Sequence, residues 1–167
     1  MTHHDRTDQH VARWLPVLPD LDPDVEGVVT RMSVLTRHLR EVKDRALADL
    51  DLQEKEYGTL HALAGRGGRA APSEIADDLR MAPASITARV DALVRRGFVR
   101  RMPSPVDRRR IDVELTDAGR ATWRRALGVV GDEEHRLLGA LTADERRLVS
   151  DLLRRVALAS ERPPARP

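Results

Sequence analysis

Residues 73–119 read SEIADDLRMAPASITARVDALVRRGFVRRMPSPVDRRRIDVELTDAG, and this stretch decides the fold. Its first part predicts a short helix, with Ser73 as the N-terminal cap and Glu74 beside the positive helix end. After a tight break, Pro83 takes the first position of a second helix. An N–H at this position has no partner within the helix, so proline, which lacks an N–H, loses no hydrogen bond there. The inner face of this second helix is the stripe Ile86, Val90, Leu93 and Val94. Two short helices joined by a three- or four-residue turn predict a helix-turn-helix, and the second is the recognition helix.

Two strands are predicted after Gly97, which ends the recognition helix. Residues 98–102 are rich in strand formers, and residues 111–115 alternate between apolar and acidic side chains. The loop from Pro103 to Arg110 contains prolines and a basic run. A helix-turn-helix followed by a basic hairpin predicts a winged helix.

Longer helices are expected on both sides of the winged helix. Apolar residues over 24–50 recur in alternating steps of three and four, which predicts a long amphipathic helix with a coiled-coil-like seam. A shorter helix is predicted around Tyr57, another after the capping residue Thr116, and a last one after Thr142, where T-x-x-E forms a capping box. The predicted fold class is therefore mainly α with a small β-hairpin wing, about six helices, and dimerisation helices from both termini.

The chain has 167 residues, which fits one domain with a hydrophobic core. We expect a partly flexible N-terminal arm over residues 1–23, with a short helix around Trp14. The domain itself is predicted over 24–158, with dimerisation helices over 24–52 and 117–158 and the winged helix-turn-helix over 53–116. Two prolines near the end predict a disordered tail over 159–167.

The charge of the chain is unevenly distributed. The formal net charge is +2, but between Arg66 and Arg110 there are 11 arginines against five acidic residues, so this segment carries +6 and the rest −4. Such a concentration is the electrostatic footprint that phosphate binding requires. With two Trp, one Tyr and one Phe, the chain has too few aromatic residues for the stacking platforms of single-strand binders. Duplex DNA is therefore the expected partner.

Several other functions are excluded by what the sequence lacks. It has no cysteine, which rules out disulfides, thiolate metal sites and thiol-based sensing. The histidines have no metal-ligand spacing, and no nucleophile–base pair or glycine-rich phosphate loop indicates an enzyme. We therefore expect no cofactor, no metal and no catalysis. No apolar run approaches the roughly 20 residues of a membrane span, and no signal core follows the N-terminus, so we expect a cytoplasmic protein with no membrane partner.

The order and spacing of these motifs resemble the MarR family of transcription regulators. The family's wing carries Asp-x-Arg a few residues before V-x-L-T-x-x-G, and this chain matches it with Asp107, Arg109, Leu115, Thr116 and Gly119. The likeness extends over residues 24–158. It implies a homodimer whose terminal helices intertwine and hold two winged helices over successive major grooves of a pseudo-palindromic operator. The apolar seams fit this independently. The alternative is that they pack within one monomer.

The recognition helix supplies the first group of predicted DNA-binding residues. At 100° per residue, Ala84, Ala88 and Arg95 lie opposite the inner stripe, and Ser85 and Thr87 flank them. Small side chains on this face allow close approach to base edges, while the two hydroxyls can bond bases or phosphates. Many family members have an arginine where this chain has Ala88. Ser73, at the start of the preceding helix, completes this group.

The wing supplies the second group. We predict that Arg109 enters the minor groove, with Asp107 orienting its guanidinium. Arg108 or Arg110 would then meet phosphates. The alternative is a solvated basic turn without a ligand.

A small ligand, often an anionic aromatic, is a further implication of the resemblance. Arg89 lies about 80° from the inner stripe of its helix, and a half-buried arginine needs an anion. Together with Trp14, it is similar to the urate-responsive subgroup, which places a tryptophan and an arginine in its pocket. That subgroup also has an aspartate beside the aromatic that corresponds to Tyr57, where this chain has Gly58. In the alternative reading, Arg89 pairs within the protein, Trp14 packs the arm and Tyr57 belongs to the core.

These observations predict a sequence-specific duplex-DNA-binding transcriptional regulator, a repressor released by a small ligand. The alternative function is a winged-helix protein-interaction module without DNA binding. Such a module would be expected to lose the wing arginines, which this chain retains.

Overall fold

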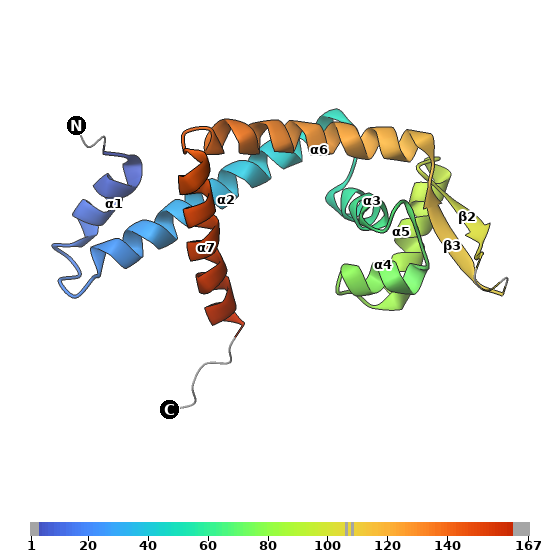
Figure 1. Ribbon diagram of the computed structural model, residues 1–167, viewed down its shortest axis with the longest axis horizontal. Coiled ribbons are helices and arrows are strands. Elements are labelled where there is room, and N and C mark those ends of the chain that lie inside the picture. Colours follow the sequence, from blue (N-terminus) through green and yellow to red (C-terminus); the bar gives the residue numbers. More distant parts are fainter. Residues whose placement is uncertain (1–3, 106, 108, 162–167) are drawn as a thin grey trace, which may run out of the picture. The chain divides into compact units, whose positions relative to one another are not determined.

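The computed structural model describes residues 4–105, 107 and 109–161 and is mainly helical, with one small sheet (Figure 1). The predicted fold class is confirmed: the short helix around Trp14 and six further helices all form within the described residues. In chain order the elements are α1 (Arg6–Trp14), α2 (Pro23–Asp49), α3 (Glu54–Gly65), β1 (Arg69–Ala70), α4 (Pro72–Asp78), α5 (Pro83–Arg95), β2 (Val99–Pro103), β3 (Ile111–Leu115), α6 (Asp117–Leu138) and α7 (Ala143–Ser160). The chain forms two units, which meet within α6 between Val130 and Gly131 and are described separately below.

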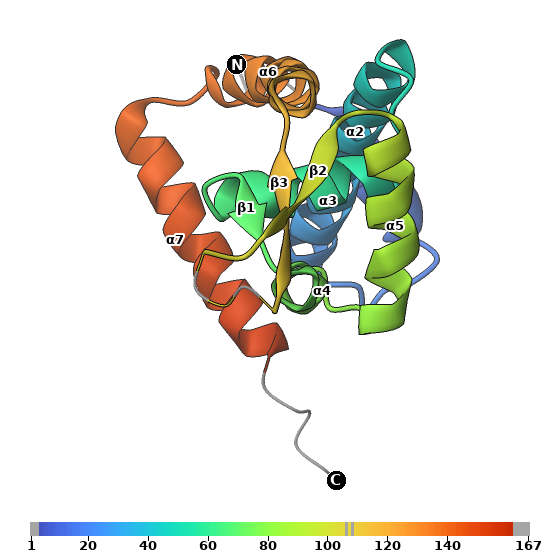
Figure 2. The same cartoon turned by 90° about the vertical axis from the view of Figure 1, so that its right-hand side faces the viewer.

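The core of the first unit lies between α3, α4, α5 and the sheet. The recognition-helix stripe is buried as predicted for Ile86, Val90 and Leu93, whereas Val94 is 37% exposed. The stripe packs in one cluster with buried apolar side chains of the other elements, including Leu60, Leu63, Ile75, Val99 and Val113. Figure 2 shows the wing strands β2 and β3 beside these three helices. The core therefore fixes α5 and the wing to the same support.

The sheet is antiparallel with the strand order β1-β3-β2. Val99 pairs with Leu115 and Pro103 with Ile111, so the hairpin predicted from residues 98–102 and 111–115 is confirmed. The third strand, β1, pairs Arg69 with Glu114 and was not predicted. Two residues are too few to show the alternation by which a strand is recognised.

Four successive helices, α2 to α5, end with the same backbone closure. The second residue after each helix has a left-handed conformation, and the N–H that follows it donates to the carbonyl five residues earlier. The left-handed residues are Asp51 (φ 48°), Gly67 (φ 76°), Arg80 (φ 50°) and Gly97 (φ 71°). The closing bonds run from Leu52 to Leu47, Gly68 to Leu63, Met81 to Ala76 and Phe98 to Leu93, at 2.8 to 3.0 Å.

The N-terminus of α4 differs from the prediction. Ser73 is not its cap, because Pro72 takes the first helical position and Ala71 becomes the N-cap. Proline suits that position, since its fixed φ is helical and it has no N–H to satisfy. The Glu74 carboxylate accepts a hydrogen bond of 2.7 Å from the Ala71 N–H. Ser73 is left exposed in the first turn.

The predicted arm contains an ordered contact between α1 and α2. Arg31 of α2 donates to the carboxylates of Asp5 (2.9 Å) and Asp8 (2.7 Å), which stand at the start of α1. The hydrogen bond from Arg31 is the main cause that lowers the pKa of Asp5 below its ordinary value. Thr7 is buried in this contact.

Gly119 brings the first turn of α6 against the start of β2. A Cβ atom at position 119 would lie 2.0 Å from the carbonyl oxygen of Phe98. That carbonyl is held, because it accepts the Thr116 N–H at 3.0 Å. The Thr116 hydroxyl donates to the Gly97 carbonyl (2.6 Å) and accepts the Gly119 N–H (3.1 Å). Thr116 therefore caps α6, as predicted, and joins it to the wing.

The second unit contains the end of α6 and the whole of α7. The capping box predicted at Thr142 is present, since Thr142 and Glu145 each accept the backbone N–H of the other. The Thr142 N–H is the main cause that lowers the pKa of Glu145. Helix α7 extends to Ser160, two residues into the predicted tail, and residues 162–167 lie outside the described part of the chain. None of the described helices is long and apolar enough to cross a membrane.

Candidate nucleic-acid interface

Helices α4 and α5 form the helix-turn-helix, joined by residues 79–82. Pro83 occupies the first turn of α5, as predicted, and the inner face of the helix is buried. The outer face is open along its length. Its exposed residues are those predicted to approach DNA: Ala84, Ser85, Thr87, Ala88 and Arg95.

The wing loop is closed by hydrogen bonds from backbone N–H groups at its base and at its tip. At the base, the Ser104 N–H donates to the Arg110 carbonyl (2.9 Å), and Ser104 is buried. At the tip, the Asp107 carboxylate accepts the backbone N–H of Arg109 at 2.9 Å. The Asp107 carboxylate thus contacts the backbone of Arg109, and this hydrogen bond shapes the turn. The predicted contact was with the Arg109 guanidinium. Arg109 and Arg110 are exposed, and Arg108 lies outside the described residues.

The root of the wing is fixed by Arg69 of β1. Its guanidinium bonds the Asp112 carboxylate on β3 (3.1 Å) and the Pro103 carbonyl at the end of β2. Asp112 is buried, so this pair joins all three strands below the loop.

Five arginines of the basic segment are engaged in ion pairs within the chain. The pairs are Arg66 with Asp78 and Glu74, Arg69 with Asp112, Arg96 with Glu56 and Asp51, Arg100 with Glu114, and Arg101 with Asp91. The hydrogen bond from Arg66 is the main cause that lowers the pKa of Asp78, and Arg100 lowers that of Glu114 in the same way. Both acids therefore stay ionised and neutralise their arginines.

The other arginines of the segment gather on the recognition helix, its preceding turn and the wing. In the part of the chain that the structure describes, no acidic side chain pairs with Arg80, Arg89, Arg95, Arg109 or Arg110. Three of these, Arg95, Arg109 and Arg110, are predicted DNA-binding residues. Arg80 is not among the predicted site residues, because the sequence of residues 80–82 indicates only a break between helices. The five paired arginines belong to the fold, whereas the charges of the other described arginines are not neutralised by an ion pair among the described residues.

The three predicted ligand-binding residues are not brought together within one chain. Trp14, which is 41% exposed, lines a cavity of about 300 Å³ with His10, Leu18, Leu21 and Glu26. Tyr57 is buried and lines a separate cavity of about 560 Å³ between α3 and the end of α4. Arg89 is half-buried, as predicted, and lines neither cavity.

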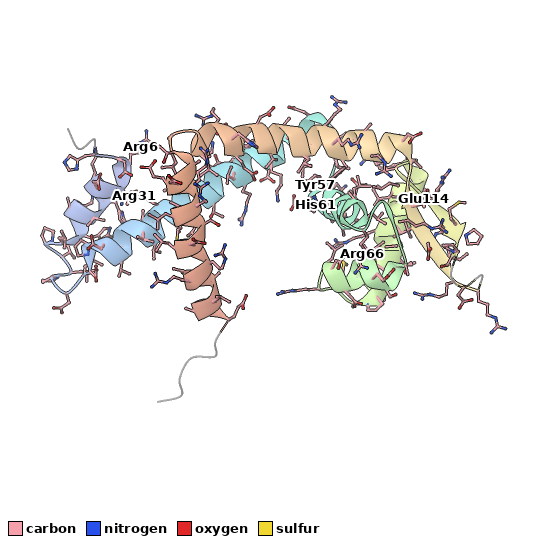
Figure 3. All side chains as sticks on the ribbon, viewed as in Figure 1. Arg6, Arg31, Tyr57, His61, Arg66 and Glu114 are labelled. Carbon is pink, nitrogen blue, oxygen red and sulfur yellow. The ribbon has the colours of Figure 1, made fainter. Side chains whose placement is uncertain are left out.

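Tyr57 and His61, which line this cavity, belong to an aromatic cluster that also includes Trp123. His61 lies next to Tyr57 on α3 (Figure 3), with their ring centroids 5.7 Å apart. Trp123 of α6 donates its indole N–H to Nδ1 of His61 at 3.2 Å. An Nδ1 that accepts leaves the proton of the neutral ring on Nε2. Local sequence spacing does not indicate this contact, because 62 residues separate His61 from Trp123. No group of metal-ligating side chains occurs among the described residues.

Comparisons with known proteins give a consistent result. A sequence model of the MarR family matches residues 48–110. The HTH-type transcriptional regulator PecS of Dickeya dadantii is 32% identical over 151 residues, covering 87% of this chain and 89% of that protein. The apo structure of MarR from Escherichia coli is similar at a TM-score of 0.60 and 27% identity, covering 76% of this chain and 94% of that one. A mutant of MepR from S. aureus, solved bound to an oligodeoxyribonucleotide, is similar at a TM-score of 0.59 and 18% identity, covering 80% and 98%. At that identity the last comparison bears on the fold alone.

Proposed function

The chain belongs to the MarR family of winged-helix transcriptional regulators, and from this we propose that it represses transcription by binding a pseudo-palindromic duplex operator as a homodimer. The observation that carries the proposal is the location of the arginines that have no acidic partner among the described residues: Arg80, Arg89, Arg95, Arg109 and Arg110 lie on the recognition helix, its preceding turn and the wing. A protein-interaction module without DNA binding would be expected to lose the wing arginines, which this chain retains.

The recognition helix would read bases through small and hydroxylic side chains. Ser85 and Thr87 are exposed and can bond base edges, and Ala84 and Ala88 permit close approach. Arg95 and Ser73 would contact the phosphate backbone of the DNA on either side of the bases that α5 reads. With no arginine at position 88, the wing carries a larger share of the affinity.

The homodimer is supported by apolar faces that have no cover within either unit. On α2 the exposed residues include Val25, Val28, Val29, Met32 and Leu35, and on α7 they include Leu148, Leu152, Leu153 and Val156. Contiguous exposed apolar side chains along a helix mark association sites. A twofold dimer buries the same patch on both chains, which suits a palindromic site.

Replacing Arg109 by alanine should weaken operator binding by about 1–3 kcal/mol, because an arginine at the wing tip loses its groove or phosphate contact. Anisotropy titration at fixed salt measures this, using a duplex selected from a random pool against the wild-type protein. Arg13→Ala, which removes an exposed arginine from α1, is the matched control. Both variants should sediment as the wild type does, at about twice the 18.7 kDa of one chain. Unchanged affinity of Arg109→Ala would remove the wing from the binding mechanism, and a monomer in the wild type would remove the dimer.

We further propose that a small anionic aromatic ligand releases the DNA. Its support within one chain is the cavity of about 560 Å³ beside Tyr57 and His61. Arg89 does not line this cavity, so its part in the ligand site is a separate expectation, based on its half-buried position and the absence of an acidic partner among the described residues. Calorimetry with a series of aromatic carboxylates should find one whose affinity falls about tenfold or more in Arg89→Ala, the loss of one charge-assisted hydrogen bond. Equal affinity for both proteins would exclude Arg89 from the site.

A further inference from the structure

The turn between α4 and α5 has Arg80 at a position whose left-handed backbone conformation favours glycine. Among the four helix ends that share the same closure, two have glycine at the left-handed position, Gly67 and Gly97. Glycine adopts this conformation freely, whereas any other side chain crowds its own backbone. Asp51 and Arg80 are the two exceptions, and each calls for an interaction that offsets the strain.

The exception at Asp51 is explained by a contact within the chain. Its carboxylate lies 3.2 Å from the guanidinium of Arg96, and its carbonyl accepts from the same group. A glycine at this position would lose the carboxylate. Both the carbonyl and the exposed carboxylate of Asp51 therefore have a partner in Arg96.

No equivalent contact is present for Arg80 in the described part of the chain. Its side chain is exposed. The nearby Asp78 is already bound by Arg66, with hydrogen bonds of 2.6 and 2.9 Å. This bond is also the main cause that lowers the pKa of Asp78, which keeps it ionised on Arg66. Arg80 is thus a cation in a strained backbone conformation, without an acidic partner among the described residues, three residues before the recognition helix begins at Pro83.

We propose that Arg80 binds a backbone phosphate of the duplex beside the groove that α5 enters, an inference that rests on the proposed DNA-binding function. When the first turn of a recognition helix enters the major groove, the residues just before it come to lie near the flanking phosphates. A guanidinium suits a phosphate because it can donate two parallel hydrogen bonds. The contact adds affinity and fixes the orientation of α5, and it carries no sequence preference.

The test compares Arg80→Gly with the wild type on the selected duplex over a range of salt concentrations. One lost phosphate contact removes about 0.9 from the slope of log affinity against log salt, which corresponds to about fivefold at 0.15 M salt. In a dimer both copies lose the contact, so the slope should fall by about 1.8. The melting temperature should stay level or rise, because glycine relieves the strain. Arg80→Lys should keep most of the slope, and Arg13→Ala should leave it unchanged.

Two results would overturn the assignment. Wild-type affinity and slope in Arg80→Gly would show that the side chain does not touch DNA. Lower affinity together with a lower melting temperature would show that Arg80 supports the fold instead. Absence of salt-dependent binding by the wild-type protein is a different failure, because it rejects the proposed DNA-binding function and Arg80's role with it.

Discussion

Gly119→Ala is expected to destabilise the protein by about 3 kcal/mol, because the added methyl group meets the backbone of Phe98. The new Cβ would lie 2.0 Å from the Phe98 carbonyl oxygen, where no flexible side chain can yield. That carbonyl is fixed by the Thr116 N–H, and Phe98 stands directly before β2. The start of α6 would have to move away from the wing, which breaks the hydrogen bonds of Thr116.

Thermal unfolding measures the effect, and α6 supplies its own control. At Gly128, in the same helix, a Cβ would meet nothing within 4 Å. Gly128→Ala should therefore raise stability by about 0.5–1 kcal/mol, because alanine favours the helix. A fall of about 6–12 °C is expected for Gly119→Ala in a domain of this size. Equal melting temperatures for the two variants would contradict the close contact.

Arg96→Met is expected to cost about 2–4 kcal/mol, because it leaves a buried carboxylate without its cation. Glu56 is only 4% exposed. It accepts a hydrogen bond of 2.7 Å from Arg96 and another of 2.9 Å from the Gln53 N–H. The same arginine holds Asp51, so it ties the end of α5 to the end of α2 and the start of α3. Methionine keeps most of the volume and removes only the charge and the donors.

A second substitution separates the effect of the unpaired Glu56 carboxylate from the loss of the contacts between Arg96 and Asp51. In Arg96→Met combined with Glu56→Gln, the buried group is neutral, and part of the lost stability should return. Denaturant unfolding of both single variants and the double variant gives the coupling. If Arg96→Met unfolds at the wild-type denaturant concentration, the pair contributes nothing to the fold.

The sequence predicted the elements with strong periodicity. The stripe of Ile86, Val90 and Leu93 and the capping box at Thr142 depend on residues three or four apart, and both are present. The Ser73 cap was wrong because a proline one position earlier competes for the helix start. β1 was missed because its two residues form a strand only by pairing with β3.

The sequence predicts which segment carries the candidate site, but it does not predict which of its arginines form ion pairs within the chain. An arginine at 69 or 96 looks like any other arginine in the basic segment. Its partner lies 43 residues away in the first case and 40 in the second, and only folding brings them together. The +6 of the segment therefore overstates the charge that a partner meets. For the same reason the cluster of Tyr57, His61 and Trp123 could not be read from local spacing.

The division of the arginines into two classes has an evolutionary consequence. An arginine that neutralises a buried acid, as Arg69 does for Asp112 and Arg96 for Glu56, cannot be lost without a cost in stability unless its acid changes too, so these positions should diverge slowly and in pairs. An arginine without an internal partner, such as Arg80 or Arg109, can be exchanged in one step with the scaffold intact. Single substitutions at these positions should therefore tune the affinity for DNA while the fold stays unchanged.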